Sequence, residues 1–90
     1  MNNPGLKTLL SILQQIKEKG PLTFYQLSLM RSRAYGLVSR YLKFCLKSEL
    51  IEIHSQHKGR GPYPSKKYQL SPKGHQLINI FERKNNEQNL

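Results

Sequence analysis

Four cationic side chains share one face of the helix predicted over residues 33–47, and this helix contains no acidic residue. At about 100° per residue, Arg40, Lys43 and Lys47 fall opposite the apolar residues, and Arg33 lies at the edge of this cationic face. A solvated helix face normally mixes charges of both signs, because opposite charges four positions apart attract each other. Arginine and lysine bind phosphate oxygens and the O6 and N7 atoms of guanine. The pattern therefore predicts that this face contacts an anionic partner.

A second group of cations lies in residues 55–67, a segment rich in glycine and proline between two predicted strands. From such a loop, Lys58, Arg60, Lys66 and Lys67 would contact phosphates or enter a minor groove. A connection of this length inside a small domain is expected to be functional. We therefore predict that it forms a basic wing beside the cationic helix.

Small and polar residues complete the predicted surface. Tyr35 and Ser39 can bond to bases or to phosphates. Gly36 lies within the cationic face, where its missing side chain would permit close approach to a nucleic-acid backbone; alternatively, it relieves crowding against the preceding helix. The candidate nucleic-acid-binding residues are Arg31, Ser32, Arg33, Tyr35, Gly36, Ser39, Arg40, Lys43, Lys47, Lys58, Arg60, Lys66 and Lys67.

The charge of the chain is concentrated where these residues lie. The sequence has 15 Lys and Arg against 5 Asp and Glu, a net charge of +10 and a pI near 10.1. Residues 31–73 hold ten of these cations and only Glu49 and Glu52, which leaves +8 in this segment. Such an excess predicts nucleic acid or an anionic membrane surface as the partner. No apolar run is long enough to span a membrane and the first residues do not resemble a signal peptide, so we expect a cytoplasmic, nucleoid-associated protein.

The residues that could support catalysis or metal binding do not form a site. There is no aspartate, and the five glutamates are not paired. Cys45 lies on the apolar face of its helix, which favours a core position, and a single cysteine allows no internal disulfide. His54 and His57 could supply half of a zinc site, but only Cys45 and the distant His75 could complete it. We predict no enzyme activity, metal or cofactor, and the sequence specifies no small-molecule effector.

Periodicity and capping residues define the elements that carry these side chains. We predict one domain over residues 1–84, followed by a polar, disordered tail over 85–90. Thr23 and Gln26 form a capping-box pattern at the start of a short second helix, and Ser32 is a plausible N-cap for the third. Ser71 and Pro72 open the last helix as N-cap and first residue. The predicted helices cover residues 6–19, 24–29, 33–47 and 72–84, and the strands cover 50–54 and 67–70.

This order predicts an α+β, mostly helical fold, a winged helix-turn-helix with a three-helix core, a β-hairpin wing and a C-terminal helix. The apolar stripes on the first and last helices each span about 160°, which is wider than one buried contact requires. A homodimer is therefore expected, and the candidate interface residues are Leu6, Leu9, Ile12, Ile78, Ile80 and Phe81.

Several short segments resemble archaeal winged-helix DNA-binding proteins, which include small chromatin-associated and transcription-regulator-like members. They are residues 34–42, 50–52 and 67–74, the last of which reads KYQLSPKG and resembles the end of the wing in many such regulators. Glu49 departs from the pattern, because the family usually has glycine before Leu-Ile. If this position is left-handed, glutamate occupies it at a cost of about 1 kcal/mol.

Taken together, the sequence predicts binding of double-stranded DNA by a transcriptional regulator or chromatin-associated protein, with residues 33–47 in the major groove and 55–67 on the backbone or minor groove. Two alternatives stay open. A basic helix and wing would serve an RNA-binding or ribosome-associated winged helix equally well. The wide apolar stripes would also suit a protein-interaction module of a transcription or replication complex.

Overall fold

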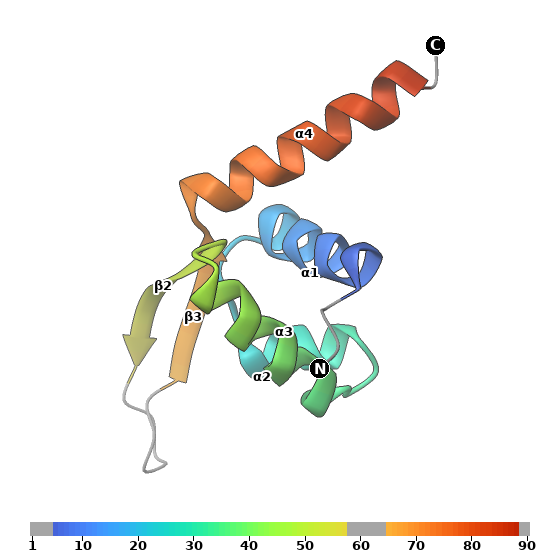
Figure 1. Ribbon diagram of the computed structural model, residues 1–90. Helices are drawn as coiled ribbons and strands as arrows, with labels where there is room; N and C mark the ends of the chain where they lie inside the picture. The colour runs from blue at the N-terminus through green and yellow to red at the C-terminus, as the bar shows by residue number, and fades with distance from the viewer. Residues whose placement is uncertain (1–4, 58–64, 89–90) are drawn as a thin grey trace.

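The computed structural model describes residues 5–57 and 65–88. The chain forms a helix, a helix-turn-helix, a β-hairpin and a final helix (Figure 1). This is the order of a winged helix-turn-helix, so the predicted α+β fold is confirmed. The elements are α1 (Leu6–Lys19), β1 (Leu22–Thr23), α2 (Phe24–Met30), α3 (Tyr35–Lys47), β2 (Ile51–His57), β3 (Ser65–Leu70) and α4 (Pro72–Gln88).

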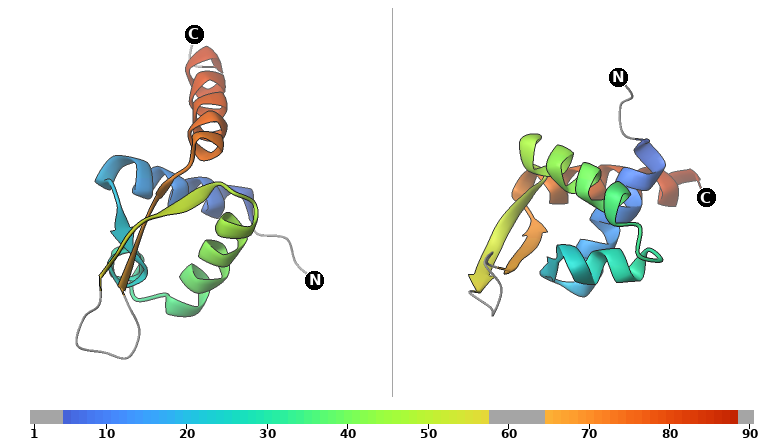
Figure 2. Two further views of the ribbon diagram at one scale, coloured as in Figure 1. Left: turned by 90° about the vertical axis from the view of Figure 1, so that its left-hand side faces the viewer. Right: turned by 90° about the horizontal axis from the view of Figure 1, so that it is seen from below.

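Helix α1 lies in the middle of the domain, with α4 on one side and the α2–α3 pair on the other (Figures 1 and 2). Its apolar residues recur at the helical spacing that keeps them on one side, and Gly20, at φ 78°, follows its last turn. The predicted bounds of this helix are confirmed. The core that it anchors consists of Leu9, Ile12, Leu13, Ile16, Leu22, Leu27, Val38, Tyr41, Leu42, Cys45, Leu50, Ile51, Leu70 and Ile78.

This arrangement corrects part of the predicted dimer interface. Leu9, Ile12 and Ile78 are buried in the core of a single chain and are not available to a second subunit. The stripe of α1 is wide because the helix packs against elements on two sides of it, which makes a second subunit unnecessary to explain its width. Leu6 and Ile80 are 53% and 57% exposed.

The start of α2 has the predicted capping box. Thr23 Oγ1 accepts a hydrogen bond from the Gln26 N–H at 3.0 Å, and Gln26 Oε1 accepts one from the Thr23 N–H at 2.9 Å. Leu22 and Leu27, which flank this box, are both buried. The capping box fixes where α2 begins, and the helix extends to Met30.

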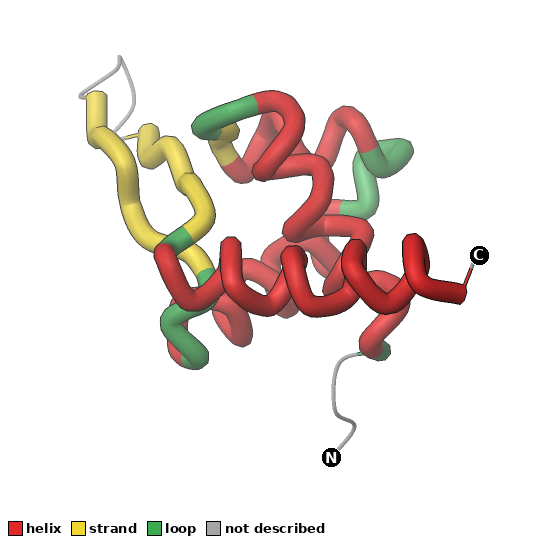
Figure 3. Tube along the Cα trace, turned by 90° about the horizontal axis from the view of Figure 1, so that it is seen from above, coloured by secondary structure: helices red, strands yellow, loops and turns green. Residues whose placement is uncertain are grey.

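The sheet has three antiparallel strands in the order β1-β3-β2 (Figure 3). The hairpin is longer than predicted, and Ile51 pairs with Leu70 while His57 pairs with Ser65. The sequence gives no sign of β1, because a two-residue strand is too short to show an alternating pattern. Its pairing of Thr23 with Lys67 joins the start of α2 to the wing.

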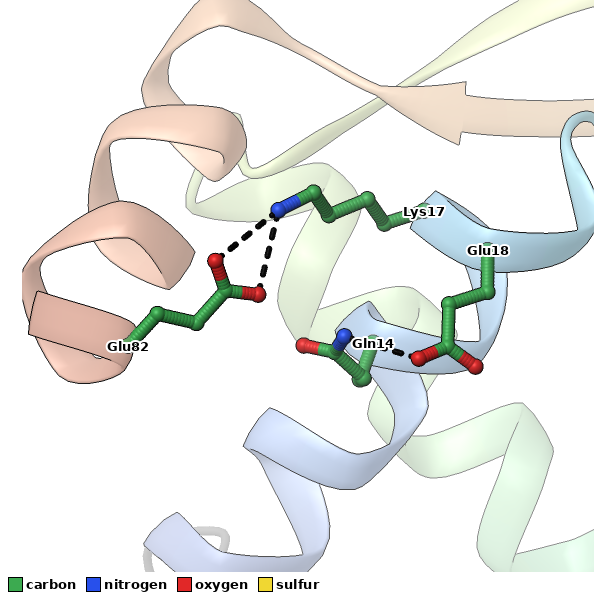
Figure 4. Close-up of polar contacts among 4 residues, drawn as sticks. All are labelled: Gln14, Lys17, Glu18 and Glu82. Atoms are coloured by element: carbon green, nitrogen blue, oxygen red, sulfur yellow. Dashed lines mark hydrogen bonds and ion pairs between the residues drawn. The ribbon is translucent and has the colours of Figure 1, made fainter. Parts of the chain in front are cut away.

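Helix α4 begins as predicted, with Ser71 Oγ accepting a hydrogen bond from the Gly74 N–H at 3.0 Å. The helix continues to Gln88, so residues 85–88, predicted to be a disordered tail, are helical. Nothing between Lys84 and Gln88 is a glycine or proline that would stop a helix. Lys17 of α1 holds α4 through an ion pair with Glu82, with Nζ 3.0 Å from Oε1 (Figure 4). No helix in the described ranges combines the length and apolarity that crossing a membrane requires.

Candidate nucleic-acid interface

The outer face of α3 presents Arg40, Lys43 and Lys47, all of them exposed, while the opposite face of the helix is buried. Ser39, on the same side as the cations, is half-buried. Within residues 5–57 and 65–82, the ion pairs join Lys17 to Glu82 and Lys73 to Glu49, and neither involves α3. The cations of α3 therefore face solvent, and no carboxylate of the described residues forms an ion pair with them.

The surroundings of α3 strengthen this positive field. From Phe24 to Lys47 the chain carries five Lys and Arg and no acidic residue. The N-terminal end of α3 has no acidic residue in its first turn, and its N-cap, Ala34, makes no side-chain capping bond. A helix N-terminus is the positive end of the helix dipole and favours an anion. The first turn of α3 and its exposed face thus both favour negative charge.

The turn before α3 differs from the prediction. Ser32 and Arg33 both lie in the left-handed region, at φ 56° and 59°, so Ser32 is not the N-cap and α3 begins at Tyr35. The Arg33 N–H donates to the Ser28 carbonyl at 2.8 Å, and the Tyr35 N–H donates to the Arg33 carbonyl at 2.8 Å. The first bond uses a carbonyl of the last turn of α2 and the second a carbonyl of the turn itself, and the chain must turn sharply to form them. Both Ser32 and Arg33 are exposed.

Arg31 has a different environment from the other candidates. Its guanidinium donates to Ser11 Oγ at 3.0 Å and to Gln15 Oε1 at 2.7 Å, both on α1. The side chain therefore braces the turn against α1, a role that the sequence pattern did not indicate.

Gly36 is exposed on the α3 face, and among the described residues no atom outside its chain neighbours and the backbone of its own helix lies within 4 Å of the position that a Cβ would occupy. The interpretation that Gly36 relieves crowding against the preceding helix is therefore wrong. The space in front of it is open, as close approach of a ligand backbone would require.

Part of the wing lies within the described residues. Lys66 is exposed on β3 and pairs with Gln56, and Lys67 is half-buried between Thr23 and Ser55. Lys58 and Arg60 lie outside the described residues.

An aromatic pair beside the α3 face was not found from the sequence. The rings of Tyr25 and Tyr35 stack with their centroids 6.4 Å apart and an interplanar angle of 18°. Phe24 also contacts Tyr35, at 6.0 Å between centroids. Tyr25 could have been noticed as an aromatic residue in the first turn of α2, on the side away from the apolar Leu27.

The cysteine and histidines considered as possible catalytic or metal-binding residues lie apart in the structure. Cys45 is buried in the core, and burial raises the pKa of its thiol from 9.0 to about 11, so it is protonated at neutral pH. His54 bonds through Nδ1 to Ser55 Oγ at 3.1 Å. No three side chains of metal-binding type come together in the part of the chain that the structure covers.

No protein-family model matches this chain, and no curated protein sequence matches it significantly. The solved structures that share its fold include the following two. Staphylococcus aureus MarR, in complex with salicylate and kanamycin, matches with a TM-score of 0.71 and 24% identity, over 90% of this chain and 53% of that one. Streptococcus pneumoniae FabT, in complex with DNA, matches with a TM-score of 0.71 and 16% identity, over 96% of this chain and 57% of that one.

These likenesses establish the winged-helix fold over most of the chain. The chain spans little more than half the length of either solved structure. The expected resemblance to winged-helix regulators is confirmed at the level of the fold, and its archaeal part stays a prediction.

Proposed function

We propose that this chain binds double-stranded DNA, with α3 in the major groove and the β2–β3 wing on the flanking backbone or minor groove. One observation carries the proposal: Arg40, Lys43 and Lys47 form an exposed cationic face with no acidic partner in the described residues. Unpaired cations on one face repel each other, and phosphates would remove this repulsion. The likeness of fold to FabT, which was solved in complex with DNA, supports DNA as the partner.

The electrostatic part of the proposal predicts a steep salt dependence. If roughly five to seven phosphates are neutralised per contact, log K falls with log[salt] with a slope of about −5 to −6. Fluorescence anisotropy with a random-sequence duplex, titrated at several salt concentrations, measures this slope. Affinity that barely changes between low and high salt would contradict the proposal.

Charge reversal locates the binding face. The double variant Arg40→Glu/Lys43→Glu should abolish duplex binding, because it replaces two phosphate contacts by repulsion. The matched control is Lys7→Glu/Lys19→Glu, which makes the same change in net charge at exposed residues of α1. Equal losses in both variants would mean that net charge alone, and not the α3 face, governs binding.

Competition with structured RNA tests which nucleic acid is the ligand. If RNA displaces the duplex at a lower concentration than competing duplex DNA does, the ligand is RNA.

We further propose that the chain acts as a homodimeric transcriptional regulator or chromatin-associated protein. The remaining exposed apolar residues on α1 and α4, Leu6 and Ile80, support a subunit contact, and the half-buried Phe81 lies next to Ile80. Sedimentation equilibrium of the wild type and of Ile80→Lys tests this. A monomer at the concentration of DNA binding would contradict the dimer and leave DNA binding intact.

A further inference from the structure

Two tyrosines beside the α3 face are exposed without an obvious role in the fold. Tyr25 is 58% exposed and Tyr35 is 40% exposed, so both rings are accessible to a partner. Neither ring belongs to the buried core or to the half-buried residues packed against it, whereas the neighbouring Phe24 does. The core therefore gives no reason for either tyrosine.

The two rings hold each other in place. They stack at 6.4 Å with an interplanar angle of 18°, and Phe24, anchored on the core, contacts Tyr35 at 6.0 Å. Aromatic pairs of this kind stabilise one arrangement of both side chains. A tyrosine has few rotatable bonds, so a stacked pair presents its hydroxyls with little entropy left to lose on binding.

The position of the pair connects the two parts of the proposed DNA surface. Tyr35 is the first residue of α3, one helical turn before Ser39 on the same side of the helix. Tyr25 lies two residues after Thr23, which pairs with Lys67 of the wing strand. No acidic residue occurs between Phe24 and Lys47, so α2, α3 and the turn between them carry no negative side chain that would repel an anionic partner at these rings.

We propose that the Tyr25–Tyr35 pair is an uncharged phosphate contact, in which the two phenol hydroxyls donate hydrogen bonds to backbone oxygens between the α3 groove and the wing. Tyrosine hydroxyls are among the donors that proteins use toward DNA phosphates. The inference rests on the proposed function and adds to it a contact that is neither cationic nor directed at base edges.

Removal of the hydroxyls alone tests this inference. Tyr25→Phe and Tyr35→Phe keep the rings and their stack and remove one donor each. Each should weaken duplex binding by about two- to tenfold, the range of a neutral hydrogen bond. The slope of log K against log[salt] should not change, because a neutral donor releases no counterion, whereas Lys43→Gln should reduce the magnitude of that slope by about 1.

The matched control is Tyr41→Phe. Its hydroxyl accepts a hydrogen bond from the Gly5 N–H at 2.9 Å on the buried side of α3, so the same chemical change should leave duplex affinity unaltered. Thermal melting of each variant confirms that the domain is folded at the assay temperature.

The outcomes separate the inference from the proposed function. If the wild type binds the duplex with a steep salt slope and both phenylalanine variants bind equally well, the phosphate contact is wrong and DNA binding stands. If Tyr25→Leu loses affinity while Tyr25→Phe does not, the ring itself is used, as in stacking on an unpaired base, and the phosphate contact is again wrong. If the wild type does not bind any duplex, the proposed function itself fails.

Discussion

Replacement of Gly74 by alanine should destabilise the domain far more than its position in a helix would indicate. A Cβ at this position would lie 2.1 Å from the Leu50 carbonyl oxygen, 3.2 Å from its carbon and 3.4 Å from Leu70 Cδ2. The obstacle is backbone at the corner between α3 and β2 and cannot rotate away. Either α4 or this corner must move by about 1 Å, since ordinary carbon–oxygen contacts exceed 3 Å.

The magnitude follows from what this movement breaks. Overpacking a well-packed site costs about 1–3 kcal/mol. Ser71 is bonded to the same corner, with its N–H donating to the Leu50 carbonyl at 3.1 Å and its hydroxyl donating to the Glu49 carbonyl. Loss of these bonds adds about 0.5–1.5 kcal/mol each, and the better helix propensity of alanine returns up to about 1 kcal/mol. The net loss should lie between about 1 and 6 kcal/mol, a large part of the 5–15 kcal/mol typical of a domain.

Urea unfolding followed by circular dichroism measures this loss, and Gly36→Ala is the matched control. Gly36 is also helical, but no described atom beyond its own helix backbone and chain neighbours lies within 4 Å of its Cβ position, so the same substitution should stabilise the domain by up to about 1 kcal/mol. Opposite signs for the two variants are the expected result. If Gly74→Ala is as stable as the wild type, α4 does not approach Leu50 as described, and the reasoning is refuted.

Three further predictions concern single contacts. Glu49→Gly should raise stability by about 0.5 kcal/mol in urea unfolding, because it relieves a φ of 62° and loses only an exposed 4.0 Å pair with Lys73. Burial raises the pKa of the Cys45 thiol from 9.0 to about 11, so the thiol contributes stability that is fully present below pH 9 and is lost as the pH rises toward 11. The loss should be roughly 2–3 kcal/mol in the free energy of unfolding. Unfolding of Cys45→Ala should depend less on pH over this range. A double-mutant cycle on Lys17 and Glu82 should give a coupling below about 1 kcal/mol that decreases with salt, since both side chains are partly exposed.

The elements that local sequence controls were predicted with their correct starts. Thr23 and Ser71 each place a side-chain oxygen where a free backbone N–H needs one, so the capping residue alone fixes where α2 and α4 begin. The turn before α3 could not be found this way, because its left-handed residues are Ser32 and Arg33 and not glycine. Their conformation depends on the hydrogen bond from the Arg33 N–H to the Ser28 carbonyl, which forms only once α2 has ended in the folded domain.

In the candidate site, too, some features were predicted from the sequence and others required the structure. The sequence shows that a residue is cationic, but not which acceptor its side chain will meet. Arg31 and Arg33 are two positions apart, yet their surroundings differ. Arg31 meets two acceptors on α1 and braces the fold, while Arg33 is exposed. Helical periodicity separated the exposed cations of α3 from its buried face because both belong to one regular element. No such regularity extends from α2 to α3, which is why the Tyr25–Tyr35 stack required the structure.

The left-handed residues of the chain also indicate how firmly the orientation of α3 is fixed. In the described residues, every non-glycine with positive φ flanks this helix: Ser32 and Arg33 come before it and Glu49 follows it. Each left-handed residue costs roughly 1 kcal/mol, and such strain persists only where the surrounding structure determines it. Here the burial of Val38 and Leu42 and the hydrogen bonds at both corners determine it. Because the same corners also hold α1, α4 and the wing, the direction of the cationic face is fixed by the fold before any partner binds, and little reorganisation is needed when phosphates arrive.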